Sequence, residues 1–423
     1  MRRPGLRLAA ALLLPALLAA CGDRMRSPGD ELARRVAEAV PAIEKATGLK
    51  FKTPPKYEAR TKDQVREFLL KKLAEENPAQ QLANEERALK LFGLIPDTLD
   101  LKKLFLSLYT EQIVGFYDPA TKTLYVVQDA PKDLLGVTVS HELVHALQDQ
   151  YIDLDSLYKA NQDQPDRQLA VQAVVEGQAT YEQMSAMLGG DANIAARLPG
   201  GWDKVREMIR DAQGSMPVFA TAPTVIQETL IFPYLSGAEF VRRFESERPG
   251  QDVLKNLPAS TEQLLETKAF FGTPKDDPTI VTLPAPRGAT KAYDSQMGEF
   301  GTRILVYQHV QDQNIAMQAA QGWDGDRYML VRTPRGEGIA WVTVWDSSVD
   351  AAEFGDAMAE ATLQRYGGTP AKTASGDLRT YTGGGRSVAI QNGEIGGRTV
   401  VLWVDLPAGA STDVIDLKAV TLK

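Results

Sequence analysis

The sequence is poor in cysteine: Cys21 is the only one in 423 residues. A disulfide within the chain is therefore excluded, and the fold has to be stabilised by core packing. Histidine is almost as scarce, with three residues in total. After the first 20 residues there is no further long uncharged apolar run, so we expect the rest of the chain to form a soluble globular body.

Basic residues are fewer than acidic ones, with 47 Lys and Arg against 55 Asp and Glu. Residues 1–20 contain three arginines and no acidic residue, which leaves 44 basic and 55 acidic residues and a formal charge of −11 in the remainder. Because such a body repels a phosphate backbone, we expect no nucleic-acid partner.

The first 20 residues combine arginines near the start with an apolar stretch that ends in small residues. This pattern predicts a signal peptide over 1–20. Leu18-Ala19-Ala20-Cys21 resembles the bacterial lipobox, in which the cysteine is acylated and becomes the new N-terminus. The resemblance implies a lipid on Cys21, a tether over 21–28 and anchoring to a membrane of the bacterial cell envelope. An Asp directly after the acylated cysteine would favour retention in the inner membrane, but this position is Gly22. We therefore expect, as the default, anchoring to the outer membrane on the side that faces the periplasm.

The run His141-Glu142-Leu143-Val144-His145 places two histidines four positions apart. On an α-helix such residues lie about 40° from each other around the axis, so both imidazoles face the same way. Glu142 lies beside this face, close enough to address a water on a bound metal and turned too far to be a ligand. The spacing is the signature of zinc metallopeptidases. The alternative is a chance match, with two ordinary polar residues on an exposed helix.

A catalytic zinc needs three protein ligands and one open position for water or substrate. The helix predicted over 167–188 carries Glu176 in its middle, and Gly177 beside it lets another helix approach closely. We therefore predict that His141, His145 and Glu176 bind Zn²⁺. A lone glutamate on a helix can also face solvent. In that case the third ligand would be one of three aspartates: Asp149, Asp155 and Asp166.

The segments HELVHALQDQ and VVEGQAT together resemble the gluzincin class of zinc metallopeptidases, and more narrowly a bacterial family of secreted or lipid-anchored, largely uncharacterised metallopeptidases. The resemblance continues through VGFYDPATKTLYVV, FPYLSGAEFV, PASTEQLLETKAF and AAQGWDGDRY. It implies zinc-dependent peptide hydrolysis with Glu142 as the general base. Gluzincins place an Asp four residues after the third ligand to orient the histidines, and this chain has Thr180 there. The partners of the two histidines are therefore unassigned.

Two further residues are candidates for stabilising an oxyanion near the zinc. A phenol in this place can donate a hydrogen bond to the tetrahedral intermediate, and Tyr234 in FPYLSGAEFV is the candidate. Buried tyrosines more often only pack. His309 in LVYQHV is the second, although a lone histidine in an apolar helix is more often structural.

The expected fold class is α+β, with a mostly helical zincin-like catalytic domain over 29–271. Within it, strands over 113–117 and 123–127 form a predicted hairpin. This hairpin is either plain structure or an edge strand that lines the cleft and pairs with an extended substrate. Thr61 and Gln64 form a capping-box pattern before a helix, and Pro41 is expected to kink or break the first helix.

The segment 272–290 has four prolines and little periodicity, which predicts a linker or long surface loop. Beyond it, 291–423 reads as a smaller α+β sheet domain, with a helix over 295–320 and later strands separated by GGG and NG turns. Asp324 and Asp326 lie in a predicted turn, where they either hold calcium or cap and bend the chain.

These features predict a zinc-dependent peptidase that hydrolyses peptide or protein substrates outside the cytoplasm. One alternative is a catalytically silent zincin-like lipoprotein that acts as a binding or assembly module of the envelope. Another is hydrolysis of a different bond, such as a cell-wall amide, which the motif alone does not exclude.

Overall fold

The computed structural model describes residues 28–76, 79–161, 163–187, 211, 214–367, 369–371 and 378–423. The predicted signal peptide, Cys21 and nearly all of the tether lie outside these residues. Over the described ranges, no helix is both long and apolar enough to cross a membrane.

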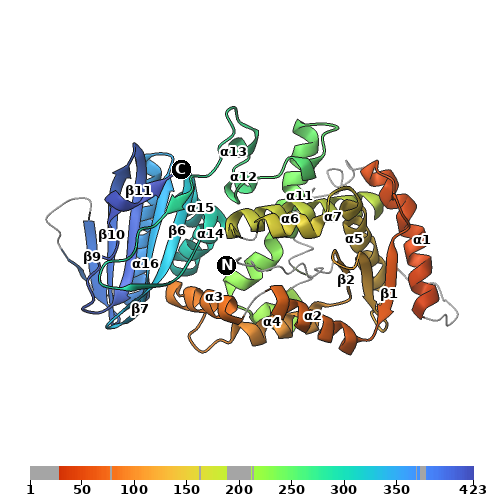
Figure 1. Ribbon diagram of the computed structural model, residues 1–423, viewed down its shortest axis with the longest axis horizontal. Coiled ribbons are helices and arrows are strands. Elements are labelled where there is room, and N and C mark those ends of the chain that lie inside the picture. The colour runs from red at the N-terminus through yellow and green to blue at the C-terminus, as the bar shows by residue number, and fades with distance from the viewer. Residues whose placement is uncertain are drawn as a thin grey trace.

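The chain is α+β, with a helical region first and a sheet region after it (Figure 1). The helices of the first region are α1 (Pro28–Thr47), α2 (Lys62–Glu76), α3 (Ala79–Phe92), α4 (Leu101–Gln112), α5 (Lys132–Tyr151), α6 (Leu154–Asn161), α7 (Pro165–Met187), α10 (Pro217–Thr221), α11 (Thr224–Glu247), η1 (Val253–Lys255), α12 (Glu262–Leu265) and α13 (Thr267–Phe271). Its strands are β1 (Lys56–Arg60), β2 (Gly115–Asp118) and β3 (Thr123–Val127).

The three strands form a small sheet in the order β1-β3-β2. The predicted hairpin of β2 and β3 is present, and β2 lies at an edge of the sheet. The parallel partner β1 was not predicted; its five residues are exposed or half-buried. The capping box is confirmed: Thr61 N–H donates to Gln64 Oε1 at 2.9 Å, and Gln64 N–H donates to Thr61 Oγ1 at 3.2 Å. The expected break at Pro41 is wrong, since α1 runs through it.

The centre of the helical region is the packing of α5, α7 and α11. Gly177 on α7 and Gly237 on α11 let these two helices touch through their backbones: a Cβ on Gly237 would lie 1.8 Å from the Ala173 carbonyl oxygen. The close approach of another helix, predicted from the position of Gly177, is confirmed. On the other side, α1 packs against α5 through residues such as Leu32 and Val36.

The sheet region has seven antiparallel strands in the order β5-β6-β7-β11-β10-β9-β8. Its elements are β4 (Val281–Thr282), β5 (Thr290–Ser295), α14 (Gly298–Val310), α15 (Gln313–Ala320), β6 (Trp323–Thr333), β7 (Gly336–Trp345), α16 (Ser348–Tyr366), β8 (Thr369–Ala371), β9 (Leu378–Gly383), β10 (Arg386–Ile395), β11 (Arg398–Pro407), η2 (Leu417–Ala419) and β12 (Thr421–Leu422).

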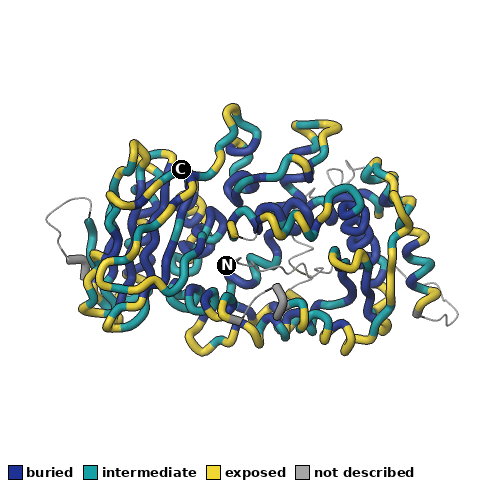
Figure 2. Tube along the Cα trace, viewed as in Figure 1, coloured by how far each residue is buried: buried dark blue, intermediate teal, exposed yellow. Residues whose placement is uncertain are grey.

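Alternate residues of β7 face opposite sides of this sheet. Trp341 and Trp345 pack into the cluster that includes α14, α15 and α16, whereas Val342 and Val344 belong to a second cluster under β4 and the C-terminal segment. Phe92 of α3 reaches the helix-covered side, with its ring 5.6 Å from that of Trp341. One buried core therefore continues from the helical region into the sheet region, as the dark tube in Figure 2 shows.

Two details of the sheet region differ from the predictions. The helix expected over 295–320 is two helices, because Gln311 takes a left-handed conformation (φ 60°) and Asp312 caps α15. The NG pair, Asn392 and Gly393, lies inside β10. The segment 272–290 contains β4, which pairs with β12, and Arg287 N–H donates to Val414 O, so this stretch is attached to the sheet region.

Candidate metal centre

Helix α5 is buried all round over 137–149, including His141 and His145. A helix in the interior has no polar outer face, which explains why this one lacks an amphipathic pattern. The two histidines therefore do not lie on an exposed helix, which the chance-match alternative assumed.

The structure brings His141, His145 and Glu176 together. Glu176 comes from the middle of α7 and is fully buried. Its Oε2 lies 3.2 Å from His141 Nε2 and 3.3 Å from His145 Nε2. The two imidazole rings are nearly perpendicular, at 85°, with centroids 4.8 Å apart. One donor atom from each of the three side chains lies within 4.8 Å of the other two, so the group can hold a metal ion.

The electrostatics of this group fit a divalent cation. Glu176 Oε1 is buried and accepts no hydrogen bond from any described residue. Burial opposes the charge on Glu176, but the neighbouring His145 and His141 lower its pKa to about 2. Burial likewise opposes a charge on His145, and the Glu176 carboxylate raises its pKa to about 9. Two imidazoles and one ionised carboxylate form a donor set typical of catalytic zinc.

Two glutamines orient the histidines. Gln183 Nε2 donates to the Val137 carbonyl at 3.0 Å, so its Oε1 faces His141 Nδ1 at 3.2 Å. Gln148 Nε2 donates to a carbonyl on α7 at 3.0 Å, so its Oε1 faces His145 Nδ1 at 2.8 Å. An amide oxygen can only accept, so each Nδ1 carries the proton. Each Nε2 faces Glu176 and is the nitrogen left to bind a metal once it has no proton, as a metal ligand needs.

Thr180 does not take this orienting role. Its hydroxyl is buried and has no hydrogen-bond partner among the described residues. The two glutamines that do take this role could have been found from the sequence. Gln148 follows His145 by three positions and Gln183 follows Glu176 by seven, and both spacings place the glutamine on the same helix face as the ligand.

Glu142 lies beside the three side chains and is held by the edge strand. Its Oε2 accepts the backbone N–H of Tyr117 in β2 at 2.6 Å. Burial raises the pKa of Glu142, while the two histidines act in the opposite direction. The outward main-chain donor of Tyr117 is therefore already bonded to Glu142. The hairpin positions this carboxylate in addition to lining the cleft.

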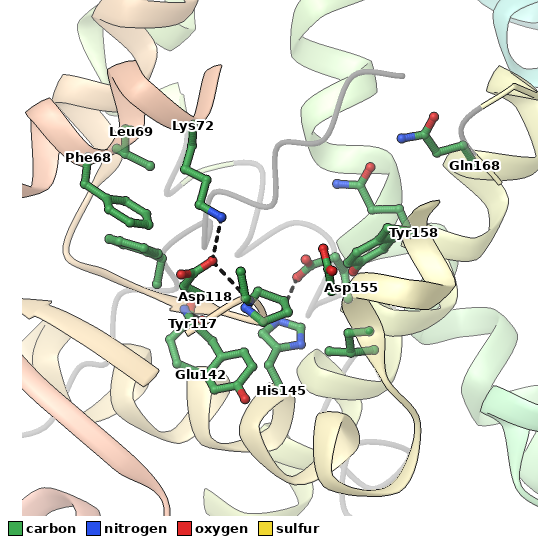
Figure 3. A pocket seen from close by; sticks show the side chains of 16 residues that line it. Phe68, Leu69, Lys72, Tyr117, Asp118, Glu142, His145, Asp155, Tyr158 and Gln168 are labelled. Atoms are coloured by element: carbon green, nitrogen blue, oxygen red, sulfur yellow. Dashed lines mark hydrogen bonds and ion pairs between the residues drawn. The ribbon is translucent and has the colours of Figure 1, made fainter. Parts of the chain in front are cut away.

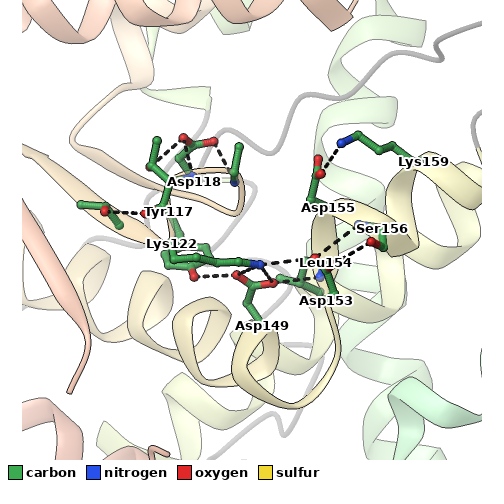
Figure 4. A network of polar contacts seen from close by, with 12 residues as sticks. Tyr117, Asp118, Lys122, Asp149, Asp153, Leu154, Asp155, Ser156 and Lys159 are labelled. Atoms are coloured by element: carbon green, nitrogen blue, oxygen red, sulfur yellow. Dashed lines mark hydrogen bonds and ion pairs between the residues drawn. The ribbon is translucent and has the colours of Figure 1, made fainter. Parts of the chain in front are cut away.

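The aspartates considered as alternative third ligands are bonded elsewhere. Asp149 lies in a polar network in which it accepts from the Tyr117 hydroxyl at 2.7 Å, Lys122 Nζ at 2.9 Å and Leu154 N–H at 2.9 Å (Figure 4). Asp155 pairs with a lysine one turn later on α6. Two hydrogen bonds join the third aspartate to α12: Asp166 accepts from Thr261 N–H and from Thr261 Oγ1.

Tyr234 lies against the centre from α11. It is 5% exposed, and its ring centroid is 5.9 Å from that of His141. Burial, with the carboxylates of Glu176 and Glu142, raises its pKa well above the ordinary value, so the phenol keeps its proton. The close contact of α7 with α11 at Gly237, three residues later, fixes this position.

A cavity of about 110 Å³ adjoins the centre. Its lining includes Glu142, His145 and Glu176. Apolar side chains of α2 and β2 form one wall, among them Phe68 and Leu69 (Figure 3). The same wall carries an ion pair, with Lys72 Nζ 2.9 Å from Asp118 Oδ1. The cavity combines apolar and charged surface next to the catalytic candidates.

The remaining candidates lie in the sheet region. His309 Nε2 bonds to the Phe92 carbonyl at 2.9 Å, and burial lowers its pKa, so it is a structural residue. Asp326 accepts two backbone N–H groups, and Asp324 accepts from Thr279 and Arg398. The expected turn is wrong, because both aspartates lie in strand β6. Asp326 caps the start of α14, and Asp324 attaches β6 to Thr279 and Arg398.

Comparison with known proteins says little about the activity of this chain. A family model described as a domain of unknown function (DUF8575) matches residues 288–416, which covers the sheet region from β5 to β11 and none of the metal centre. Among solved structures, the chain is similar to a candidate hydrolase with a novel fold from Chloroflexus aurantiacus, with 16% identity, a TM-score of 0.35, and coverage of 57% of this chain and 88% of that one. No curated protein matches.

Proposed function

We propose that the protein is a zinc-dependent peptidase of the gluzincin type. His141, His145 and Glu176 would hold Zn²⁺. The observation that carries this proposal is the convergence of these three side chains, with both Nε2 atoms facing Glu176 and both Nδ1 atoms bonded to glutamines, beside a second carboxylate, Glu142, that is not part of the set. A buried carboxylate with a purely structural role would be expected to have hydrogen-bond partners on both oxygens. Glu176 Oε1 has none among the described residues.

A bound Zn²⁺ would supply Lewis acidity at the scissile carbonyl and lower the pKa of water. Glu142 acts as the general base: it takes a proton from the attacking water and passes it to the leaving amine. The Tyr117 N–H holds this carboxylate in one place, and burial raises its pKa towards the range in which it both accepts and returns a proton. Tyr234, with its raised pKa, stays a donor and stabilises the oxyanion.

The substrate is a peptide or protein segment. The cavity beside the centre offers apolar surface from Phe68 and Phe116 together with the charged pair of Lys72 and Asp118. Such a mixture suits a polypeptide, whose side chains are partly apolar and whose backbone needs polar partners. The edge strand β2 lines the same cavity and brings main-chain groups to it.

The decisive experiment compares the wild type with Glu142→Gln. Because Glu142 is not one of the three converging side chains, the variant should keep its zinc content, measured by elemental analysis, and its melting temperature. Hydrolysis of a broad peptide pool should fall by about 10²–10⁴-fold. Zinc-loaded wild type that cleaves no peptide in the pool would contradict the peptidase and favour a silent binding module. Release of cell-wall fragments by the wild type alone would instead indicate hydrolysis of a cell-wall amide.

The cellular location is part of the proposal. We infer from the sequence that Cys21 carries a lipid and attaches the enzyme to the cell envelope, so that it acts outside the cytoplasm. A Cys21→Ser variant should leave the membrane fraction or accumulate uncleaved, because the acyl chains stabilise membrane binding by about 0.8 kcal/mol per buried CH₂. Wild-type protein without lipid in the soluble fraction would contradict the anchor.

A further inference from the structure

A second group of carboxylates lies where the helical and sheet regions meet. Glu262 is on α12, Asp276 is in the segment after α13, and Asp346 directly follows β7. One oxygen from each of these side chains lies within 4.8 Å of the other two. The fold thus gathers like charges from three separate segments, an arrangement that is unfavourable unless something neutralises it.

No described cation neutralises the group. Glu262 is 3% exposed, and its Oε2 accepts no hydrogen bond from the described residues. The nearby basic side chains are engaged with other acids: Lys275 pairs with Asp277 at 3.5 Å, and Arg398 pairs with Asp324. Burial raises the pKa of Asp276 and Asp346, and the charge of Arg398 acts from there in the opposite direction, to lower both. A buried carboxylate oxygen without a partner is costly, and the Glu262 side chain lies beside two other carboxylates.

The neighbourhood adds further negative charge. Burial, and then the adjacent Glu299 carboxylate, raise the pKa of Glu262 to about 10, so without a cation a proton neutralises this side chain. The three carboxylates line a cavity of about 460 Å³ together with two more acids, Glu266 and Asp350, and two lysines, Lys268 and Lys275, so acids outnumber bases in the lining. Asp346 is exposed, which gives an ion a path from solvent.

We propose that Glu262, Asp276 and Asp346 form a Ca²⁺ site that joins α12 to the end of β7. An all-oxygen set selects a hard cation, in contrast to the imidazole-containing centre on α5 and α7. Ca²⁺ takes six to eight oxygens at about 2.3–2.6 Å, so ligands on opposite sides lie about 5 Å apart, which fits the observed spacing. The cavity has room for the waters that complete the shell. Mg²⁺ has a smaller and stricter shell and should bind less well.

The test uses the whole protein carrying one equivalent of Zn²⁺ in Ca²⁺-free buffer. Adding CaCl₂ to about 100 times Kd should raise the melting temperature by about 3–5 °C, and the same concentration of MgCl₂ should raise it less. Tb³⁺ serves as a luminescent substitute for Ca²⁺. Its emission should be sensitised by Trp345, which precedes Asp346 in the chain, and should be displaced by Ca²⁺.

Two variants separate this site from unspecific cation binding. Asp346→Asn changes an exposed residue and should fold normally, and Glu262→Gln replaces the buried carboxyl by an amide. Both should lose the Ca²⁺ response. Without Ca²⁺ both should melt no lower than the wild type, because Asp346→Asn reduces repulsion and the amide in Glu262→Gln replaces a carboxyl that is already neutral. The control Glu394→Gln, an exposed acid on β10, should keep the full response. No Ca²⁺ response in the wild type, or an undiminished one in Asp346→Asn, overturns the proposal.

Discussion

The helical and sheet regions both bury carboxylates, and two of these, Glu176 and Asp326, are satisfied differently. In the sheet region, Asp326 is fully buried and accepts the backbone N–H groups of Met297 and Gly298 and the indole N–H of Trp341, each at 2.9 Å. In the helical region, Glu176 is equally buried, yet one of its oxygens accepts no hydrogen bond from the described residues.

The difference separates structural from functional carboxylates. A buried acid that the backbone satisfies fixes the path of the chain, as Asp326 does between β6 and the start of α14. A buried acid that has an unpaired oxygen and lies beside other potential ligand atoms is arranged to bind a cation, which the chain itself does not supply. Glu176 and Glu262 both belong to the second kind. The predictions below test this distinction.

The largest expected effect follows from removing a ligand. Glu176→Gln or His145→Ala should lower Zn²⁺ affinity by at least about 10³-fold and abolish activity, because two ligands hold the ion poorly. The matched control is Glu182→Gln on the same helix. Burial raises the pKa of Glu182 to about 8, so at neutral pH the carboxyl is mostly protonated and the amide replaces it closely.

Competition titration with a chromogenic chelator measures both affinities. Full zinc occupancy in Glu176→Gln, together with loss of zinc in Asp149→Asn, would show that the third ligand is misassigned.

The next effect concerns the contact of α7 with α11. In Gly237→Ala the new Cβ would lie 1.8 Å from the Ala173 carbonyl oxygen, so the helices must separate. The free energy of unfolding should fall by about 3 kcal/mol, as measured by urea denaturation. The control Gly214→Ala has no atom within 4 Å of its Cβ and should change stability by less than about 0.5 kcal/mol. Equal effects in the two variants would refute the close approach.

A smaller effect is expected from the glutamines that orient the histidines. Gln148→Leu and Gln183→Leu should each lower zinc affinity by about 10–100-fold while the three ligands remain. The control is Gln150→Leu, since the Gln150 amide bonds to the chain at 52–53 instead. If all three variants bound zinc with wild-type affinity, the histidine tautomers would not depend on these amides.

The last effect, small over any one pH unit, is a dependence of stability on pH. Burial and the charge of Glu245 raise the pKa of Glu182 from its ordinary value near 4.3 to about 8. Between these values the folded protein holds a proton that the unfolded chain has lost. The free energy of unfolding should therefore decrease as pH rises from about 4 to 8, by about 1.4 kcal/mol per pH unit at most.

Calorimetric melting temperatures at pH 5, 6, 7 and 8 measure this dependence. The slope should be shallower in Glu182→Gln, which has no proton to lose. An unchanged slope in that variant would show that other groups cause the dependence.

The sequence by itself determined the local parts of this protein. The spacing within HELVH, the position of Glu176 in the next long helix, the capping box of Thr61 and Gln64, and the hairpin of β2 and β3 each depend on residues within a few turns or one short connection. Helical and strand periodicities act over this range, so a single sequence is enough to recognise them.

Only the tertiary structure decided which distant groups meet. It brought the Tyr117 N–H to Glu142, turned two glutamine amides towards His141 and His145, and gathered Glu262 with two aspartates from other segments. These contacts depend on how helices and strands pack, which the local pattern does not encode. A glutamine on a helix has the same propensity whether its amide faces water or a metal ligand, and burial alone distinguishes the two cases.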